Sequence, residues 1–337
     1  MRHLPLPLVS LLAACAASDA AEPVLIEDFL ERSAAVHCEA APALSARESV
    51  VEDVVTVSDS TFLVLYGQDR EVVLVGPDLA PRWVVPFTED GPTGVRRPVS
   101  AALVGDTLLY VADQYRQVLK RLGLDGRDLG AVRLPFPPQR VQAVGRGVYV
   151  TPFVLGRHPD RLVFRVEGEE VRALAIPTLA YADPGMNVLA NTAVVSVFPD
   201  GGVVVTHEFL VPFAHRFRVD AEESVRRVPI PLPEAVGSAL RRPPVRTLEE
   251  TAPADLPVAV LSAAPDVRTG DLVYLTRSGR TTADGTLEKA IVRLDRELRY
   301  RGSYVLDVNA IRMAYLAARG VAAVVDDLDR WYTCPAA

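Results

Sequence analysis

The sequence has few of the residues that mark several protein classes. Its 337 residues include 3 cysteines, 3 methionines and 2 tryptophans, beside 27 prolines. Frequent proline favours short strands and fixed turns over long helices. Acidic residues outnumber basic ones and give a formal net charge of −7. The chain therefore lacks the excess of positive charge that non-specific nucleic-acid binding requires.

Most enzyme signatures are missing as well. The sequence contains no nucleophile elbow, Walker loop, HExxH motif or dinucleotide glycine fingerprint. It also has no heptad repeat, no low-complexity tract and no second apolar segment that would suit a membrane span. The missing motifs favour a binding role over a catalytic one, but they do not identify the ligand.

The N-terminus predicts where the protein acts. Met1-Arg2-His3 is a short basic start, and Leu4–Ala14 is an apolar run shorter than the roughly 20 residues of a membrane-spanning helix. The small residues before Cys15 resemble the lipobox of bacterial lipoproteins. This resemblance implies a signal peptide over residues 1–14, cleavage before Cys15, acylation of Cys15 and a tether over residues 15–23. Ala16 favours the outer membrane, facing the periplasm or the exterior. The alternative is plain secretion, with Cys15 in a discarded signal peptide.

If Cys15 carries the lipid anchor, two cysteines remain for a disulfide. These are Cys38 and Cys334, one near each end of the mature chain. Two cysteines allow only one intramolecular pairing, and an exported location permits it. Closing so long a loop restricts the unfolded chain by roughly 5 kcal/mol in the entropy model. The alternative is two free buried thiols.

A repeated strand unit is the main signal in the chain. In GDTLLYVADQYRQVLKRLGLDG, from Gly105, we predict a turn, a strand over Leu108–Ala112, a polar corner, a strand over Gln117–Leu122 and a turn at Asp125-Gly126. The turn and second strand recur six times, at Ser58–Gly67, Gly105–Gln114, Gly145–Pro152, Asp200–Glu208, Thr269–Ser278 and Arg319–Asp327. A third-strand element follows five copies, and little chain remains after the sixth.

Six units of about four strands, the last one cut short, predict an all-β, six-bladed β-propeller over residues 24–335. The missing outer strand of the last blade should come from the N-terminus, within Val24–His37, so that no edge stays free. This closure brings Cys38 close to Cys334. A parallel β-solenoid is the alternative fold. A proline-rich insertion at residues 229–257, with a possible helix at Glu234–Leu240, joins the fourth and fifth units and suits a functional loop.

The second unit also carries a family resemblance. Tyr110–Gly130 (YVADQYRQVLKRLGLDGRDLG) resembles an NHL-type repeat, in which a strand ends in Ala-Asp and the next leads to an Asp-Gly turn. Over the mature chain the pattern is similar to six-bladed propellers with NHL or TolB-type repeats. The resemblance implies an architecture and leaves the activity open, because propellers support many functions.

The candidate ligand site is one rim of the ring, where the corners between second and third strands meet the loops that link successive blades. The predicted ligand-binding residues on this rim are Asp113, Tyr115, Arg116, His158, His207, Glu208 and Arg277. Asp113 also fits a turn-former that bonds nearby backbone, and Arg116 and Arg277 also fit solvated charges. The apolar loop Phe209–Phe213 looks exposed and suits a partner surface.

These patterns lead to two functional hypotheses. The first is a lipid-anchored, monomeric envelope propeller that binds or scaffolds a protein, peptide or glycan partner, with no cofactor. The second is a metal-dependent hydrolase or lactonase with a divalent ion such as calcium in the central channel. Calcium-dependent lactonases with six blades place carboxylates and asparagines in that channel, and here only Asn309 lies near a predicted innermost strand.

Overall fold

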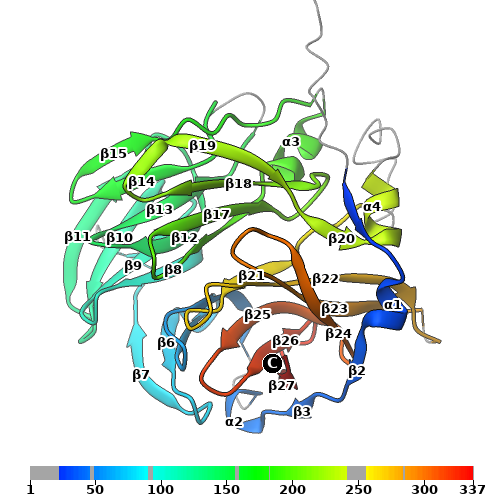
Figure 1. Cartoon of the computed structure of the whole chain (residues 1–337). Helices are drawn as coiled ribbons and strands as arrows, with labels where there is room; N and C mark the ends of the chain where they lie inside the picture. Colours follow the sequence, from blue (N-terminus) through cyan, green and yellow to red (C-terminus); the bar gives the residue numbers. More distant parts are fainter. Residues whose placement is uncertain are drawn as a thin grey trace, which may run out of the picture.

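Six small sheets follow one another around a ring in sequence order (Figure 1). The computed structural model describes residues 23–45, 49–89, 94–155, 159–181, 183–240, 256–283 and 285–336. The all-β, six-bladed propeller predicted from the repeats is confirmed. In the second unit the strands fall within a residue or so of the prediction, and Gly126 occupies its turn with φ 77°, where glycine is favoured.

The strands of each blade are consecutive in the chain for the first four blades. Blade one consists of β4 (Val51–Thr56), β5 (Phe62–Tyr66), β6 (Glu71–Val75) and β7 (Pro81–Pro86). Blade two consists of β8 (Pro98–Val104), β9 (Leu108–Asp113), β10 (Val118–Gly123) and β11 (Asp128–Arg133). Blade three consists of β12 (Pro138–Val144), β13 (Gly147–Pro152), β14 (Phe164–Glu167) and β15 (Glu170–Ala173). Blade four consists of β16 (Ala193–Val197), β17 (Gly202–His207), β18 (Phe213–Arg218) and β19 (Ala221–Pro229).

The last two blades include strands from the N-terminus. Blade five consists of β21 (Ser262–Pro265), β22 (Leu272–Thr281), β23 (Leu287–Leu294), β24 (Tyr300–Leu306) and, parallel to β24, β2 (Ala34–Val36). Blade six consists of β25 (Ala310–Leu316), β26 (Val321–Asp326), β27 (Trp331–Pro335) and β3 (Glu39–Ala40).

Each blade packs face to face on the next, and the second strands show why their sequences are continuously apolar. In β5 (FLVLY) every residue is buried. Phe62, Val64 and Tyr66 lie in the core shared with blade six, whereas Leu63 and Leu65 lie in the core shared with blade two. Side chains alternate between the two faces of a strand, so a strand sandwiched between blades needs apolar residues at every position. Six such cores join successive blades, including the sixth to the first.

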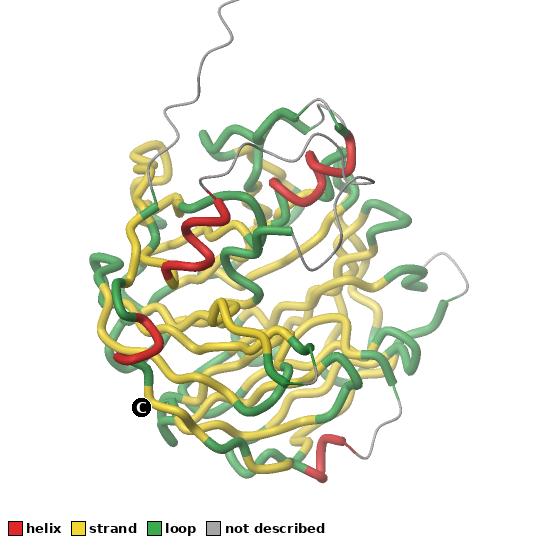
Figure 2. The backbone as a smooth tube through the Cα atoms, turned by 90° about the vertical axis from the view of Figure 1, so that its right-hand side faces the viewer, coloured by secondary structure: helices red, strands yellow, loops and turns green. Residues whose placement is uncertain are grey.

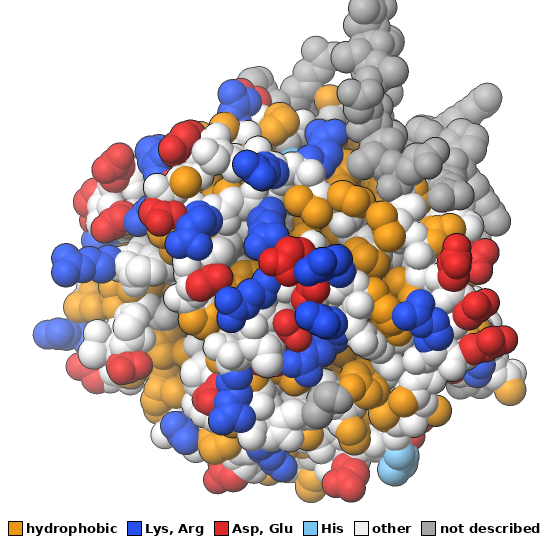
Figure 3. Space-filling model, viewed as in Figure 1, with side chains coloured by type: hydrophobic (Ala, Val, Ile, Leu, Met, Phe, Trp, Pro, Cys, Tyr) orange, Lys and Arg blue, Asp and Glu red, His pale blue; other side chains and the backbone are white. Residues whose placement is uncertain are grey.

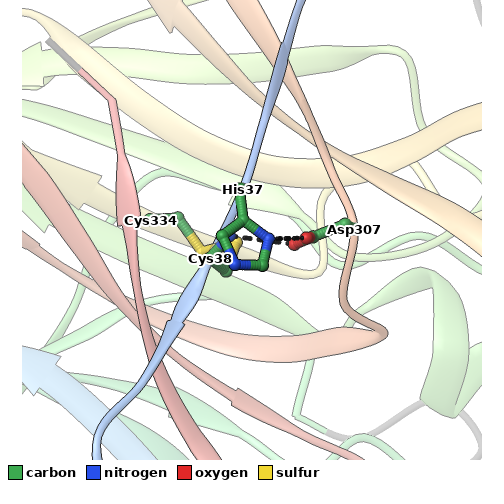
Figure 4. Close-up of a disulfide and its surroundings, with 4 residues drawn as sticks. All are labelled: His37, Cys38, Asp307 and Cys334. Carbon is green, nitrogen blue, oxygen red and sulfur yellow. Dashed lines mark hydrogen bonds and ion pairs between the residues drawn. A yellow bond between two sulfur atoms is a disulfide. The ribbon is translucent and has the colours of Figure 1, made fainter.

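The N-terminus closes the ring through β3, which pairs antiparallel with β27. The predicted disulfide between Cys38 and Cys334 is confirmed, and it lies directly beside this pairing (Figure 4). The Cys38 N–H and the His37 ring both bond the Asp307 carboxylate, which fixes the entering chain against the loop between blades five and six. The predicted range of the closing strand was wrong. The bridge at Cys38 sets the register, so closure begins at Glu39 and not within Val24–His37.

The residues before Cys38 follow a different path. The strand β1 (Val24–Ile26) pairs parallel with β20 (Pro231–Pro233), and β2 extends blade five. Four short helices occur in the described residues: α1 (Phe29–Arg32), α2 (Pro42–Ser45), α3 (Pro184–Ala190) and α4 (Glu234–Leu240). Strands make up most of the remaining backbone (Figure 2). The predicted helix in the proline-rich insertion is confirmed as α4. Cys15, the signal peptide and most of the tether lie outside the described residues.

No helix among those described has the length and apolar content needed to cross a membrane.

The innermost strands β4, β8, β12, β16, β21 and β25 stand next to one another around the axis, and β25 contacts β4. Each begins at a loop that links it to the preceding blade. Two cavities lie along the axis, one beside Asp53, Arg140 and Arg312 and the other beside Val57, Leu103 and Val197. The second has a volume of about 230 Å³. We call the end with Arg140 and Arg312 the channel mouth.

Candidate functional site

The corners between second and third strands lie at the end of the ring where the innermost strands begin. The Asp113 carboxylate accepts the backbone N–H groups of Arg96 and Arg97, just before β8. Phe153, in the corner of blade three, donates to the Pro137 carbonyl before β12. In the corner of blade six, the Asp329 carboxylate accepts the N–H of Val51, the first residue of β4. These corners and linking loops therefore share one rim around the channel mouth, as the sequence predicts.

A buried ion-pair network crosses the channel mouth. Arg140, on β12, places Nη1 2.8 Å from Asp53 Oδ1 on β4 and Nη2 3.2 Å from Glu208 Oε1 after β17. The side chains of Arg140, Asp53 and Glu208 are only 13%, 7% and 6% exposed. Burial by itself would lower the pKa of Arg140, but the Asp53 and Glu208 carboxylates outweigh it and raise the pKa. Blades one, three and four are tied together by one guanidinium.

Asp53 is saturated by further donors. Its carboxylate accepts the Ser100 hydroxyl from β8 and the N–H of Val54 at 3.0 Å. The Ser100 hydroxyl oxygen in turn accepts the N–H of Val141 at 3.0 Å. Because every partner is held by another, this part of the mouth is rigid and is already complete.

Arg312, on β25, lies at the same mouth, but its hydrogen-bond donors are not all paired. Its Nη1 donates to the Ile311 carbonyl at 3.1 Å, and its buried Nε has no hydrogen-bond partner. Among the described residues, no carboxylate lies within ion-pair distance of it. Burial, and then the charge of Arg140, lower the pKa of Arg312. Burial raises the pKa of the nearby Glu52 carboxyl, against the opposing effect of Arg97. The mouth thus holds a partly buried guanidinium that has no direct counter-ion among the described residues.

Asp53, Arg140 and Arg312 are not among the residues predicted from the sequence. Each occurs near the start of an innermost strand, as in VEDVVT, PQRVQAV and AIRMAYL. A charged residue at that position in several first strands is the signal that would have identified them, because these starts converge at one end of a propeller channel.

Of the predicted residues in blade two, Asp113 and Arg116 make local contacts. Asp113 is fully buried and also accepts the N–H groups of Tyr115 and Arg116, each at 3.0 Å. Arg116 Nη1 donates to the Gly94 carbonyl at 2.5 Å. Asp113 therefore organises the corner, whereas Tyr115 projects from it and is 66% exposed. The Arg96 guanidinium lies over the Tyr115 ring, 5.4 Å from its centroid.

The predicted pair His207 and Glu208 divides between two environments, because β17 ends at His207. Glu208 enters the channel-mouth network, and His207 is fully buried beneath α3. His207 Nδ1 donates to the Ala190 carbonyl at 2.8 Å, which leaves Nε2 as an acceptor, and Nε2 has no partner. Arg277 donates to the Leu256 carbonyl at 2.9 Å. His158 lies outside the described residues.

Apolar side chains project from several corners of the rim. Tyr115, Leu155 and Leu328 are 66%, 59% and 66% exposed and belong to the corners of blades two, three and six. The expectation that the loop Phe209–Phe213 is exposed was wrong. Val211 and Phe213 are buried, and Phe209 bridges to Val258, because the chain returning from the proline-rich insertion covers this loop.

Acidic and basic side chains are interspersed over the middle of the face shown in Figure 3, without a separate patch of one sign. Within the described part of the chain, no group of three His, Cys, Asp or Glu side chains is arranged to hold a metal ion. The carboxylates that face the channel, Asp53 and Glu208, are instead paired with Arg140.

No protein-family model matches the chain, and no curated protein matches its sequence. Solved structures match its fold. A member of the DUF4221 family from Bacteroides vulgatus is 8% identical, with a TM-score of 0.59 over 90% of this chain and 96% of that one. A Bacteroides fragilis protein is 10% identical, with a TM-score of 0.54 over 93% and 97%. An inactive virginiamycin B lyase from Staphylococcus aureus, solved with quinupristin, is 8% identical, with a TM-score of 0.52 over 90% and 99%. At such identities these likenesses show the propeller fold alone.

Proposed function

We propose that this propeller is a binding module whose channel-mouth rim docks a protein or peptide partner at the bacterial cell envelope. The observation that carries the proposal is the position of Tyr115, Leu155 and Leu328, three strongly exposed apolar side chains on corners of a single rim. Single exposed apolar residues are common on any protein. Three at the tips of loops that surround one channel mouth suit a shared contact surface.

The chemistry of the rim supports a protein partner. Interfaces combine apolar anchors with a polar surround, and tyrosine and arginine are enriched where binding energy concentrates. Tyr115 with Arg96 over its ring offers both in one corner. The anchors project from a ring held by six packed cores and closed by a disulfide, so little order would have to be gained on binding.

The envelope location rests on the N-terminal segment, whose apolar run and Cys15 predict export and lipid anchoring. The Cys38–Cys334 disulfide is compatible with an oxidising compartment. A lipid anchor followed by a short tether would hold the ring close to a membrane surface, where a partner in the same envelope is within reach.

Site-specific photo-cross-linking in the native host tests this function. A photoreactive amino acid replaces Tyr115, Leu155 or Leu328 in separate variants. Matched controls replace Val84 and Leu129, which are 38% exposed on the outer strands β7 and β11. We expect one discrete protein adduct shared by the rim positions and absent from the outer-strand positions. Adducts at the outer strands only, or no protein adduct at any rim position, would refute rim docking.

A further inference from the structure

We propose that the channel mouth is a carboxylate-binding site in which Arg312 receives an acidic group of the docked partner. The claim that this site recognises a partner rests on the proposed function. The claim that the site binds an anion can be tested without any partner. The occupant is either an acidic side chain or a free C-terminal carboxylate, since both present the same two oxygens to a guanidinium.

The hydrogen-bond donors of Arg312 are not all paired in the folded protein. A guanidinium carries five N–H donors in a planar fork that fits a carboxylate with two parallel bonds. In Arg312 one donor reaches the Ile311 carbonyl and the buried Nε reaches nothing. Desolvating a charged donor without a partner is unfavourable, so an incoming carboxylate restores interactions that folding removed.

Two carboxylates of the mouth are not free to pair with Arg312. Asp53 and Glu208 are both held by Arg140, and Asp53 also binds the Ser100 hydroxyl. Glu52 lies close enough for its charge to act on Arg312, but among the described residues it forms no ion pair with it, and burial raises the pKa of its carboxyl. Moving either carboxylate to Arg312 would break an ion pair in a buried network. One arginine of the mouth is therefore structural, and the other is available to a ligand.

A small space and a further donor lie beside Arg312. Arg312, Arg140 and Gln142 line one cavity at the mouth, with a volume of only about 30 Å³. The Gln142 side-chain amide makes no hydrogen bond within the described residues, so its N–H group can donate to the same carboxylate. The rim anchors surround this opening, which would let a partner make apolar contacts outside while one acidic group enters.

The direct test follows the Nε–H signals of arginine by ¹⁵N–¹H NMR on the whole mature chain. The Arg312 signal is the one that disappears in Arg312→Gln. The probe is sodium acetate at constant ionic strength, with acetamide as the neutral control. We expect a saturable shift of the Arg312 signal with acetate and none with acetamide. An unmoved Arg312 signal at about 100 mM acetate, a concentration that would reveal even weak binding, overturns the site.

Thermal melts supply a second readout that does not depend on assignment. We expect acetate to raise the Tm of the wild type and of Arg133→Gln, whose arginine is exposed on the outer strand β11. Arg312→Gln should lose the response, and Arg312→Lys should bind about tenfold more weakly because the fork is lost. An equal response in Arg312→Gln would contradict the assignment.

Two peptides distinguish the sources of the carboxylate. One carries an internal aspartate and an amidated C-terminus, and the other carries a free C-terminus and no acidic side chain. Stronger displacement of the Arg312 signal by one of them identifies the source, and no displacement by either contradicts recognition of a peptide acid. Because these measurements use no native partner, they can succeed or fail independently of rim cross-linking.

Discussion

Acidification should destabilise this protein through a buried histidine pair in blade four. His207 and His215 lie on the neighbouring strands β17 and β18, with ring centroids 5.6 Å apart. Burial lowers the pKa of His207 to about 4 and the pKa of His215 to about 3. These values include the charge of His207 acting on His215 and the charge of Arg227, whose guanidinium lies over the neighbouring Phe213 ring, acting on both; the Ala190 carbonyl opposes the shift at His207. Both rings are therefore neutral in the folded protein at neutral pH.

The sign and size of the effect follow from linkage. Below the ordinary histidine pKa of 6.5 the histidines of the unfolded chain bind protons, whereas those of the native state stay neutral. The free energy of unfolding is therefore highest above pH 6.5 and falls as the pH drops toward 4 and 3. Each pH unit in this window removes about 1.4 kcal/mol per histidine. Between pH 7 and pH 4.5 the pair should lower the free energy of unfolding by about 4–5 kcal/mol.

Denaturant unfolding as a function of pH measures this loss. His215→Phe keeps an aromatic ring beside Phe213 and should remove about half of the histidine contribution, roughly 2 kcal/mol at pH 4.5. His37→Gln compares the loss of an exposed histidine, since this side chain is 83% exposed, although it also removes the bond to Asp307. Parallel losses of stability in His215→Phe and the wild type would contradict this prediction. Titration of the ring-proton signals of His207 and His215 near pH 6.5 would contradict it as well.

Three further substitutions test the packing and the site. Replacing both Cys38 and Cys334 by serine should lower the free energy of unfolding by about 5–6 kcal/mol in the chain-entropy model, given their separation of 296 residues; an unchanged urea midpoint would contradict closure by this bridge. Arg140→Met should cost about 3–5 kcal/mol in chemical denaturation, because it leaves two buried carboxylates unpaired; a cost below about 1 kcal/mol would mean that they are solvated. Asp113→Ala should lower the free energy of unfolding by about 2–4 kcal/mol, because four backbone N–H groups lose their acceptor. An unchanged free energy of unfolding would mean that Asp113 does not organise the corner and would favour a role in ligand binding.

The fold could be predicted from the sequence because the repeats are explicit. Turns rich in Gly, Asp or Ser and apolar second strands recur in every blade, and a strand buried on both faces must be apolar throughout, as FLVLY in β5 shows. The two cysteines near the ends then indicated closure. The position of the closing strand could not be predicted, because Ala34–Val36 and Glu39–Ala40 have equally weak strand patterns. Their choice of partner depends on the tertiary packing of the disulfide.

The site was predictable only as a rim. Corner residues such as Tyr115 follow from the repeat register, and the exposure of Tyr115 agrees with a place on the surface. The pairing of Arg140 with Asp53 and Glu208 joins residues 87 and 68 positions apart, which no local pattern reveals. For the same reason the apolar loop Phe209–Phe213 looked exposed in the sequence, although the chain that returns after the proline-rich insertion covers it.

The proposed site for ligands is the end of the ring where the innermost strands begin. Hydrogen–deuterium exchange of the mature protein, alone and with the partner captured by rim cross-linking, tests it most directly. We expect protection in the corners at residues 114–117 and 327–330 and at the starts of β12 and β25. Protection confined to the turns at the opposite end, at residues 105–107, 145–146 and 267–270, would contradict it.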